Sequence, residues 1–255
     1  MIFQVLGCSG SECGDRHPCS FLVGPTTLAD MGSAASHLSL EEQCGISDIF
    51  LSHAHLDHTK DLAFFLENVL ELISKPVRVR GTAETLHNVQ EHLLNGRVWA
   101  DFAALPDSNE GTLKYEPFSV RTPVRMKGFD VFAVPTNHVA GSAALFFSTP
   151  EGSVLYSSDT GPTEEMWSET KKRQGKMRAI LLEASFPNRF DKVAQASGHL
   201  TPDLFRKELE KIGGFKVPIF AYHMKAPYEK ETRKEILGLG DPRVRILEPG
   251  MKIEF

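Results

Sequence analysis

The sequence predicts an α/β fold in which the ends of several strands meet at one site. Short apolar stretches typical of buried strands alternate with longer stretches that have the three- and four-residue apolar spacing of a helix. Six of the predicted strands are followed or ended by a histidine, an aspartate or a glutamate, and strand ends on one sheet edge commonly carry chemistry. Because neither a repeat nor a linker is evident, residues 1–255 are expected to form one domain.

The composition narrows the class of protein. With 41% hydrophobic and 24% charged residues, the chain has the balance of a soluble globular domain. A net charge of -5 argues against binding nucleic acid over the whole surface, although a local basic face remains compatible with it. The sequence has neither an apolar run of membrane-spanning length nor the basic start of a secretory signal, and its four cysteines form no CxxC pair. We therefore expect a reduced, cytoplasmic protein without a membrane partner.

The predicted strands and helices alternate along the chain. Gly24 and Pro25 mark a hairpin turn, and apolar residues within 62–73 recur as on the buried face of a helix. Thr82 and Thr201 stand where helix N-caps are expected. Strands are predicted at 2–6, 21–23, 27–30, 49–51, 76–80, 115–120, 128–134, 144–148, 154–157, 178–183, 217–222 and 243–247, and helices at 38–44, 62–73, 82–94, 163–174, 203–212 and 228–237.

A cluster of histidines follows the predicted strand at 49–51. His53 and His55 are two residues apart, so in extended chain their side chains leave on the same face. Asp57 and His58 are adjacent and point differently, which suits a second metal ion. Imidazole and carboxylate are ligands of zinc and similar divalent ions. A solvated loop or structural histidines would need four coincidences here, so a site for two metal ions is the favoured interpretation.

Five further side chains with the same chemistry stand at strand ends. Asp30 stands two residues before Gly32. It is expected either to hydrogen-bond to a metal-binding histidine and so orient it, or simply to cap a turn. Each of the others, taken alone, is compatible with a turn residue. Their repetition is hard to explain without a shared metal centre. These positions are Asp30, His138, Asp159, Glu183 and His223.

The His-x-His-x-Asp-His run at 53–58 resembles the signature of the metallo-β-lactamase superfamily, and the resemblance covers nearly the whole chain. It implies a four-layer αβ/βα sandwich of two mixed β-sheets flanked by helices. It also implies two divalent metal ions, zinc in the first place, with manganese or iron as alternatives. The implied ligands are His53, His55 and His138 for one ion, Asp57, His58 and His223 for the other, and Asp159 as the bridge between them.

Two further blocks narrow the branch of the superfamily. Residues 183–187 (Glu-Ala-Ser-Phe-Pro) and 198–202 (Gly-His-Leu-Thr-Pro) resemble blocks of class II cyclic-nucleotide phosphodiesterases, as does His-Met-Lys at 223–225. The first two blocks also resemble those of tRNase Z enzymes. Such short blocks are better evidence for phosphodiester chemistry than for any particular substrate.

The expected mechanism is attack on phosphorus by a metal-bridging hydroxide, with Asp57 among the catalytic residues. His199 is expected to donate a proton to the leaving oxygen, and Glu183 to orient His199 and stabilise its charged form. Alternatively, His199 is a histidine at the start of a helix and has no role in catalysis. Lys225 is a candidate phosphate contact or a solvated surface lysine, and Ser142 is a weaker candidate for a substrate contact.

The favoured function is hydrolysis of a 3′,5′-cyclic nucleotide to the nucleoside monophosphate, with a small anionic phosphodiester as partner. An RNA-processing nuclease of the tRNase Z type is the nearest alternative. Only 21 positions (159 minus 138) separate His138 from Asp159, which leaves no room there for a tRNA-gripping arm. A thioester or lactone hydrolase and a metal-binding sensor with little turnover complete the alternatives. Nucleic acid is a less favoured partner, and a homodimer is left open, with residues 95–112 expected to border the pocket or form the dimer contact.

Overall fold

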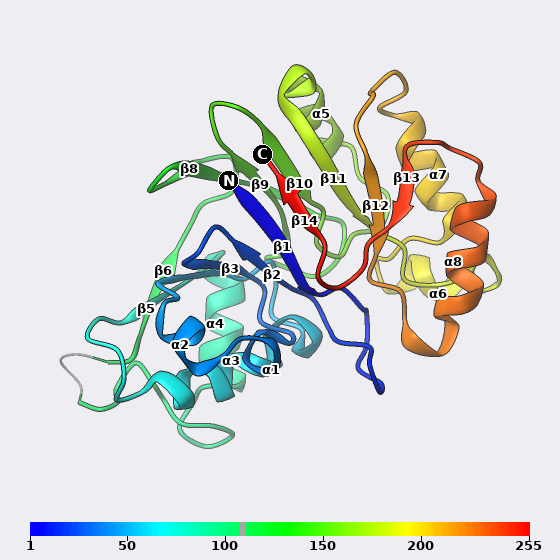
Figure 1. Ribbon diagram of the computed structural model, residues 1–255. Coiled ribbons are helices and arrows are strands. Elements are labelled where there is room, and N and C mark those ends of the chain that lie inside the picture. Colours follow the sequence, from blue (N-terminus) through cyan, green and yellow to red (C-terminus); the bar gives the residue numbers. More distant parts are fainter. Residues whose placement is uncertain (108–110) are drawn as a thin grey trace.

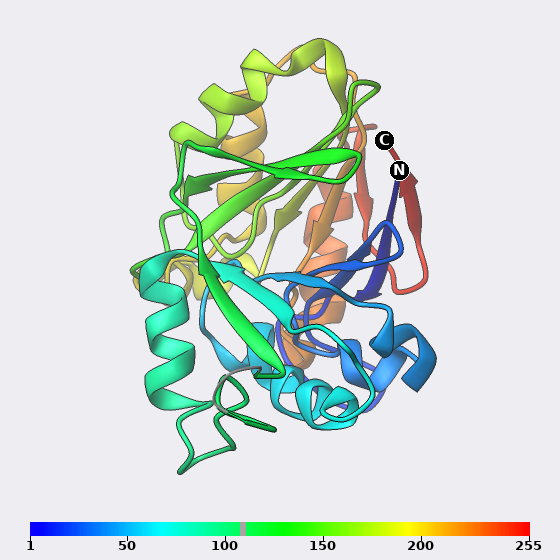
Figure 2. The ribbon, with the colours of Figure 1, turned by 90° about the vertical axis from the view of Figure 1, so that its left-hand side faces the viewer.

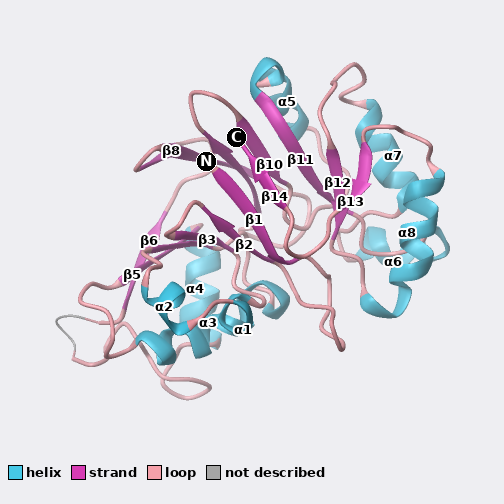
Figure 3. Ribbon diagram, viewed as in Figure 1, coloured by secondary structure: helices cyan, strands magenta, loops and turns pink. Residues whose placement is uncertain are grey.

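The computed structural model describes residues 1–107 and 111–255, and two seven-stranded sheets lie face to face within these ranges (Figures 1 and 3). Both sheets are mixed: one half of each is antiparallel and the other half is parallel. The first sheet has the order β14 (Lys252–Glu254), β1 (Ile2–Gly7), β2 (Ser20–Val23), β3 (Thr27–Ala29), β4 (Asp48–Phe50), β5 (Val77–Gly81) and β6 (Leu113–Pro117). The second has the order β13 (Val244–Ile246), β12 (Ile219–Tyr222), β11 (Met177–Glu183), β10 (Ser153–Tyr156), β9 (Ala143–Ser148), β8 (Phe129–Pro135) and β7 (Pro123–Met126).

Helices cover the outer face of each sheet, which gives the predicted four layers (Figure 2). Beside the first sheet lie α1 (Ala34–His37), α2 (Leu40–Cys44), α3 (Leu56–Val69) and α4 (Ala83–His92). Beside the second lie α5 (Glu165–Lys172), α6 (Asp191–Ala196), α7 (Pro202–Glu210) and α8 (Glu229–Gly238). The predicted fold class is thereby confirmed.

Three apolar clusters hold the layers together. The middle cluster joins the two sheets, and in it Phe21 packs against Tyr156 with ring centroids 4.8 Å apart. The outer clusters bury one face of α3 against the first sheet and of α7 against the second. Alternate residues of the strands therefore face different clusters, as the pleat requires. On the basis of the shared middle cluster we propose that residues 1–255 form one domain.

Several short elements differ from the sequence prediction. The helix predicted at 38–44 corresponds to α2 alone, because Leu38 has extended backbone (φ −97°, ψ 135°) and ends the preceding helix α1, which was not predicted. Ser39 then begins α2 with a capping box to Glu42. β7, β14 and α6 were not predicted, since each is short and has few buried residues to set a period.

The helix α3 begins at Leu56, earlier than predicted, so Asp57 and His58 lie in its first turn. The negative charge of Asp57 is favourable there because the N-terminus of a helix carries partial positive charge. Among the residues that the structure describes, no helix is both long enough and apolar enough to cross a membrane.

Candidate metal centre

The predicted site residues lie together where strands of both sheets end. Strands β3, β4, β8, β10 and β12 each lead into one or more of them within a few residues. Three residues at these turns have left-handed backbone, namely Asp30 (φ 56°), Ser158 (φ 54°) and His223 (φ 66°). Such conformations are strained for residues with a side chain and cluster at functional sites.

One group of side chains consists of His53, His55, His138 and Asp159, whose ligand atoms lie within 4.8 Å of one another. His138 Nε2 is 3.1 Å from His55 Nδ1. Asp159 Oδ2 is 3.7 Å from His53 Nε2 and 3.8 Å from His138 Nε2. His55 is exposed whereas His53 is fully buried, so the group is open to solvent on the His55 side.

The second group consists of Asp57, His58, Asp159 and His223. His223 Nε2 lies 3.2 Å from Asp159 Oδ1 and 3.4 Å from Asp57 Oδ2. His58 Nε2 is 3.4 Å from Asp159 Oδ1 and 3.2 Å from His223 Nε2. Asp159 therefore turns one carboxylate oxygen toward each group, as the sequence predicts for a bridging residue.

The two groups fit divalent metal ions. His53 Nε2 and Asp159 Oδ1 are buried and have no hydrogen-bond partner within the described ranges, which is costly unless another group meets them. Burial, together with the neighbouring imidazoles, holds the pKa of His53 well below its usual range, so this ring is neutral and can ligate. Imidazole and carboxylate donors in this number suit zinc and similar ions.

Cys19 lies beside the second group. Its sulfur is close enough to His58 and His223 to share an ion. Burial raises the pKa of the Cys19 thiol well above its usual value, and the Sγ atom donates to Ser9 O at 3.8 Å. Cys19 is thus a buried, protonated thiol bonded to the backbone of Ser9, and it could ligate an ion only by losing that proton.

Asp30 stands directly behind these histidines. Its Oδ2 atom is 2.7 Å from His58 Nδ1 and accepts from the Tyr156 hydroxyl at 2.5 Å. Ser52 donates to the same carboxylate through both its backbone N–H and its hydroxyl, each at 2.7 Å. These contacts direct His58 Nε2 toward the second group, as is usual for the partner of a metal-binding histidine.

His199 and Glu183 form a buried pair at the edge of the centre. His199 Nδ1 is 2.8 Å from Glu183 Oε1. The ring of His199 lies 4.8 Å from that of His138 and 5.6 Å from that of His223, one histidine from each group. Burial opposes a charge on His199, but the Glu183 carboxylate outweighs it and raises the pKa of His199 above its ordinary value.

Comparison with known proteins agrees with this geometry. A family model described as "Beta-lactamase superfamily domain" matches residues 24–223. The chain belongs to the beta-lactamase superfamily. The matched region begins before β3 and ends at His223, so it contains all the predicted ligands.

Two curated superfamily relatives carry phosphodiesterase names. A 3′,5′-cyclic-nucleotide phosphodiesterase of Aliivibrio fischeri is 31% identical over an alignment of 187 residues, and the match covers 64% of this chain and 52% of that protein. A probable 3′,5′-cyclic-nucleotide phosphodiesterase of Yersinia pestis is 26% identical over an alignment of 225 residues, and the match covers 75% of this chain and 61% of that protein. The chain thus spans only 52% and 61% of the length of these relatives.

Solved structures of other proteins have the same fold. Unliganded yeast PDE1 superimposes with a TM-score of 0.82 at 16% identity, covering 100% of this chain and 99% of that one. The short form of human tRNase Z superimposes with a TM-score of 0.70 at 16% identity, covering 100% of this chain and 99% of that one. At such identities the likeness concerns the fold alone.

The weaker predictions for substrate contacts have different surroundings in this superfamily member. Lys225 Nζ lies 3.3 Å from Asp57 Oδ2 and donates to Gly10 O at 2.6 Å, so it borders the second group. The Ser142 hydroxyl donates to Val139 O at 2.7 Å and accepts from Thr136 at 2.8 Å within the turn between β8 and β9. Lys225 is therefore the stronger candidate.

The segment at 95–112 lies beside α3. Trp99 packs its ring against exposed Phe64 at a centroid distance of 5.2 Å, and Val98 next to it is 62% exposed. Residues 108–110 fall outside the described ranges. A pocket border or dimer contact in this segment stays a prediction.

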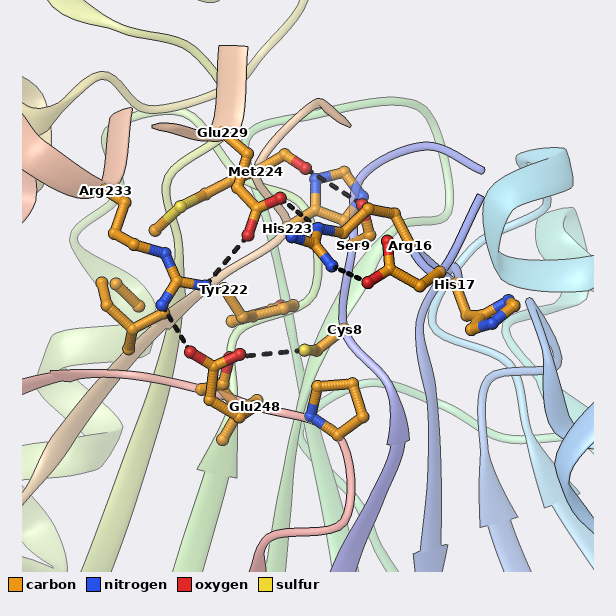
Figure 4. Close-up of a pocket in the computed structure, with 15 residues that line it drawn as sticks. Cys8, Ser9, Arg16, His17, Tyr222, His223, Met224, Glu229, Arg233 and Glu248 are labelled. Atoms are coloured by element: carbon orange, nitrogen blue, oxygen red, sulfur yellow. Dashed lines mark hydrogen bonds and ion pairs between the residues drawn. The ribbon is translucent and has the colours of Figure 1, made fainter. Parts of the chain in front are cut away.

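A small cavity of about 40 Å³ lies behind His223 (Figure 4). Its charged residues are paired with one another, because Glu229 binds both Arg16 and Arg233, Arg16 also binds Asp15, and Arg233 also binds Glu248. Burial raises the pKa of the Cys8 thiol to about 12, and acidic neighbours add to the effect, so Cys8 stays protonated. Since Cys8 O accepts from His223 N at 2.8 Å, this region supports the His223 turn.

Sequence reasoning missed the residues that support the ligands. Ser52, Ser185 and Tyr156 are fully buried and reach the site only through hydrogen bonds to other side chains. The signal for Ser52 was its position directly before His53, and for Ser185 its place inside the 183–187 block. The chain alone does not reveal which carboxylate each hydroxyl meets.

Proposed function

We propose that this protein is a dinuclear metal-dependent phosphodiesterase that hydrolyses a 3′,5′-cyclic nucleotide to the nucleoside monophosphate. One observation carries this proposal, namely the Glu183-held imidazole of His199 beside both ligand groups. A metal-binding sensor does not need a charged imidazole at this position, because it catalyses no reaction. A thioester or lactone hydrolase needs such an imidazole less than a phosphodiesterase does. A poor alkoxide leaving group needs a proton donor.

In the proposed holoenzyme, His53, His55 and His138 hold one ion and Asp57, His58 and His223 hold the other, with Asp159 shared. Zinc is the proposed metal, and manganese or iron would fit the same donors. When bound, the ions would supply a water of lowered pKa and positive charge beside the phosphate. The four cysteines are free thiols, in keeping with the cytoplasmic location that we propose.

His199 acts in the proposed reaction through its Nε2 atom. Because Glu183 Oε1 accepts from His199 Nδ1 at 2.8 Å, the second proton of the charged ring stands on Nε2. The raised pKa of His199 keeps a larger fraction of the ring protonated near neutral pH. The ring can therefore give this proton to the leaving oxygen of the diester, and Glu183 stabilises the charge before the transfer.

The pH profile should depend on Glu183. The protonated form of His199 is the active acid, so turnover is lost as pH rises through the raised pKa of His199. Glu183→Gln removes the negative charge, lowers that pKa and should move the alkaline limb of the kcat profile to lower pH. At pH 8 we expect a loss of roughly tenfold or more. A kcat profile measured from pH 5 to 9 with cyclic AMP checks this, and an unmoved alkaline limb would contradict the role of Glu183.

A cluster of aromatic rings supports a nucleotide as the substrate. Phe186 lies 5.7 Å from the ring of His199 between centroids and continues into Phe190 and Tyr228, at 6.3 and 6.4 Å from Phe186. All three rings are partly exposed. Because His199 protonates the leaving oxygen, the nucleoside attached to that oxygen extends toward Phe186. Nucleobases stack on such rings without strong sequence preference.

Phe186→Leu should therefore weaken binding of the nucleobase. We expect KM for cyclic AMP and cyclic GMP to rise about tenfold, since one base–aromatic stack contributes about 1–3 kcal/mol. KM for methyl ribofuranoside 3′,5′-cyclic phosphate, which has the same diester and no base, should not change. Phe132→Leu is a matched control, because Phe132 packs beside Arg173 on the outer side of the second sheet. Equal effects on both substrates would contradict base stacking.

The alternatives are separated by one panel of substrates. The second candidate function is that of an RNA nuclease of the tRNase Z type, because the short form of human tRNase Z has the same fold over the full length of this chain. The interval between His138 and Asp159 contains only β9, β10 and their turn. Metal analysis and assays with bis-p-nitrophenyl phosphate, cyclic AMP, cyclic GMP, pre-tRNA and a thioester test the proposal. The absence of metal-dependent hydrolysis across this panel would refute it.

A further inference from the structure

The same arrangement of hydrogen bonds occurs twice around the centre, once for each sheet. Each unit contains a carboxylate, a serine and two histidines. The serine donates its backbone N–H and its hydroxyl to the carboxylate, one histidine contacts the carboxylate, and the other contacts the serine oxygen. The units are Asp30, Ser52, His58 and His53 in the first sheet, and Glu183, Ser185, His199 and His223 in the second.

In the first unit, Ser52 Oγ lies 2.7 Å from Asp30 Oδ2 and 3.1 Å from His53 Nδ1. A second hydroxyl, that of Ser158, is farther from the same nitrogen at 3.4 Å. Asp30 and Ser52 are fully buried, so water does not compete for these bonds. The hydroxyl has one hydrogen, and the carboxylate can only accept.

In the second unit, Ser185 Oγ lies 2.9 Å from Glu183 Oε2 and 2.9 Å from His223 Nδ1. His199 Nδ1 is 3.1 Å from the same hydroxyl but closer, at 2.8 Å, to Glu183 Oε1. Ser185 and Glu183 are fully buried as well. Each hydroxyl therefore gives its hydrogen to the carboxylate and accepts one from an imidazole Nδ1.

These bonds determine which nitrogen of each histidine carries the hydrogen. With Nδ1–H directed at a serine, the lone pair of His53 and of His223 stands on Nε2. His53 Nε2 is buried and has no hydrogen-bond partner among the described residues, and His223 Nε2 faces Asp57 and Asp159. A lone pair at that atom is what an ion requires, whereas the opposite tautomer would present an N–H to it.

We infer that Ser52 and Ser185 are positioning residues that fix the Nε2-ligating tautomers of His53 and His223, one in each metal group. The inference rests on the proposed two-metal function. Ser52 serves the group of His53, His55 and His138, and Ser185 serves the group that contains His223. Loss of either hydroxyl should thus weaken the binding of one metal ion selectively. Ser185 also touches the carboxylate that holds His199, so its loss should lower kcat in addition.

Chelator competition with zinc tests this in Ser52→Ala and Ser185→Ala. We expect each variant to lose about 10- to 100-fold in affinity for one of two ions and to retain the other. Ser52→Thr and Ser185→Thr keep the hydroxyl and should restore affinity. Ser153→Ala is the matched control, because Ser153 is a buried serine that bonds to Ser148 and Phe147 O. Unchanged dissociation constants in both alanine variants would overturn the inference.

A second measurement needs no variant. Long-range ¹H–¹⁵N correlation spectra of the metal-free wild-type protein report the tautomer of each neutral histidine. We expect Nδ1–H for His53 and His223, and an Nε2–H form of either ring would overturn the inference even if an alanine variant failed to fold. Wild-type protein that binds neither zinc nor manganese nor iron would instead refute the proposed function, while the spectra would still test the tautomers.

Discussion

Replacing His199 by alanine should lower kcat for cyclic AMP by about 10²- to 10⁴-fold, the usual contribution of a positioned general acid. Two metal ions should remain bound, since His199 Nδ1 is held by Glu183 and neither metal group depends on its ring. The loss should be much smaller with bis-p-nitrophenyl phosphate, whose leaving group departs without a proton. Steady-state kinetics on both substrates and metal analysis of the purified variant measure these effects.

His87→Ala provides the control for that experiment, because His87 is an exposed histidine on α4 outside both groups. It should leave both activities unchanged. If His199→Ala kept full turnover of cyclic AMP, His199 would have no part in the chemistry. An equal loss on both substrates would point to a disturbed metal centre instead of a missing acid.

Asp159→Asn should abolish turnover and lower the affinity of both ions together. The carboxylate directs Oδ1 to His58 and His223 and Oδ2 to His53 and His138, so its charge is shared between the groups. An amide has the same shape without the charge and would turn an NH₂ toward one ion. Because loss of a supporting hydrogen bond already costs 10- to 100-fold in affinity, loss of a shared ligand should cost more at each site.

Metal stoichiometry after gel filtration and thermal unfolding with and without zinc would measure that change. Ions that bind only the folded state raise Tm, and the rise grows with the logarithm of their affinity, so zinc should stabilise the wild type more than the variant. Asp130→Asn, which alters an ion pair with Arg125 at the hairpin of β7 and β8, should behave as the wild type. A variant that retains two tightly bound ions would exclude Asp159 as the bridge.

Much of the site could be predicted because it depends on local chain geometry. His53 and His55 follow a buried strand with the spacing of a shared face, and Asp159 and His223 follow strands in the same way. Periodicity also located the long helices, since apolar residues on α3 recur over several turns. The short strands β7 and β14 have too few buried residues to produce a pattern.

The supporting hydrogen bonds could not be predicted for a different reason. Ser52 meets Asp30 across 22 positions of the chain, and Ser185 meets His223 across 38. The spacing of a hydroxyl along its own strand says nothing about a side chain that arrives from another strand. These pairs depend on which strands lie side by side within each sheet, β3 beside β4 and β11 beside β12.

The left-handed turns at Asp30, Ser158 and His223 cost the fold stability, while the side chains of Asp30 and His223 belong to the candidate metal centre. At each turn glycine would relieve backbone strain of about 1 kcal/mol or more. At Asp30 and His223 it would also delete a side chain of the centre. Stability alone would favour glycine at these turns, so the backbone strain at Asp30 and His223 is the cost of placing their side chains in the candidate metal centre.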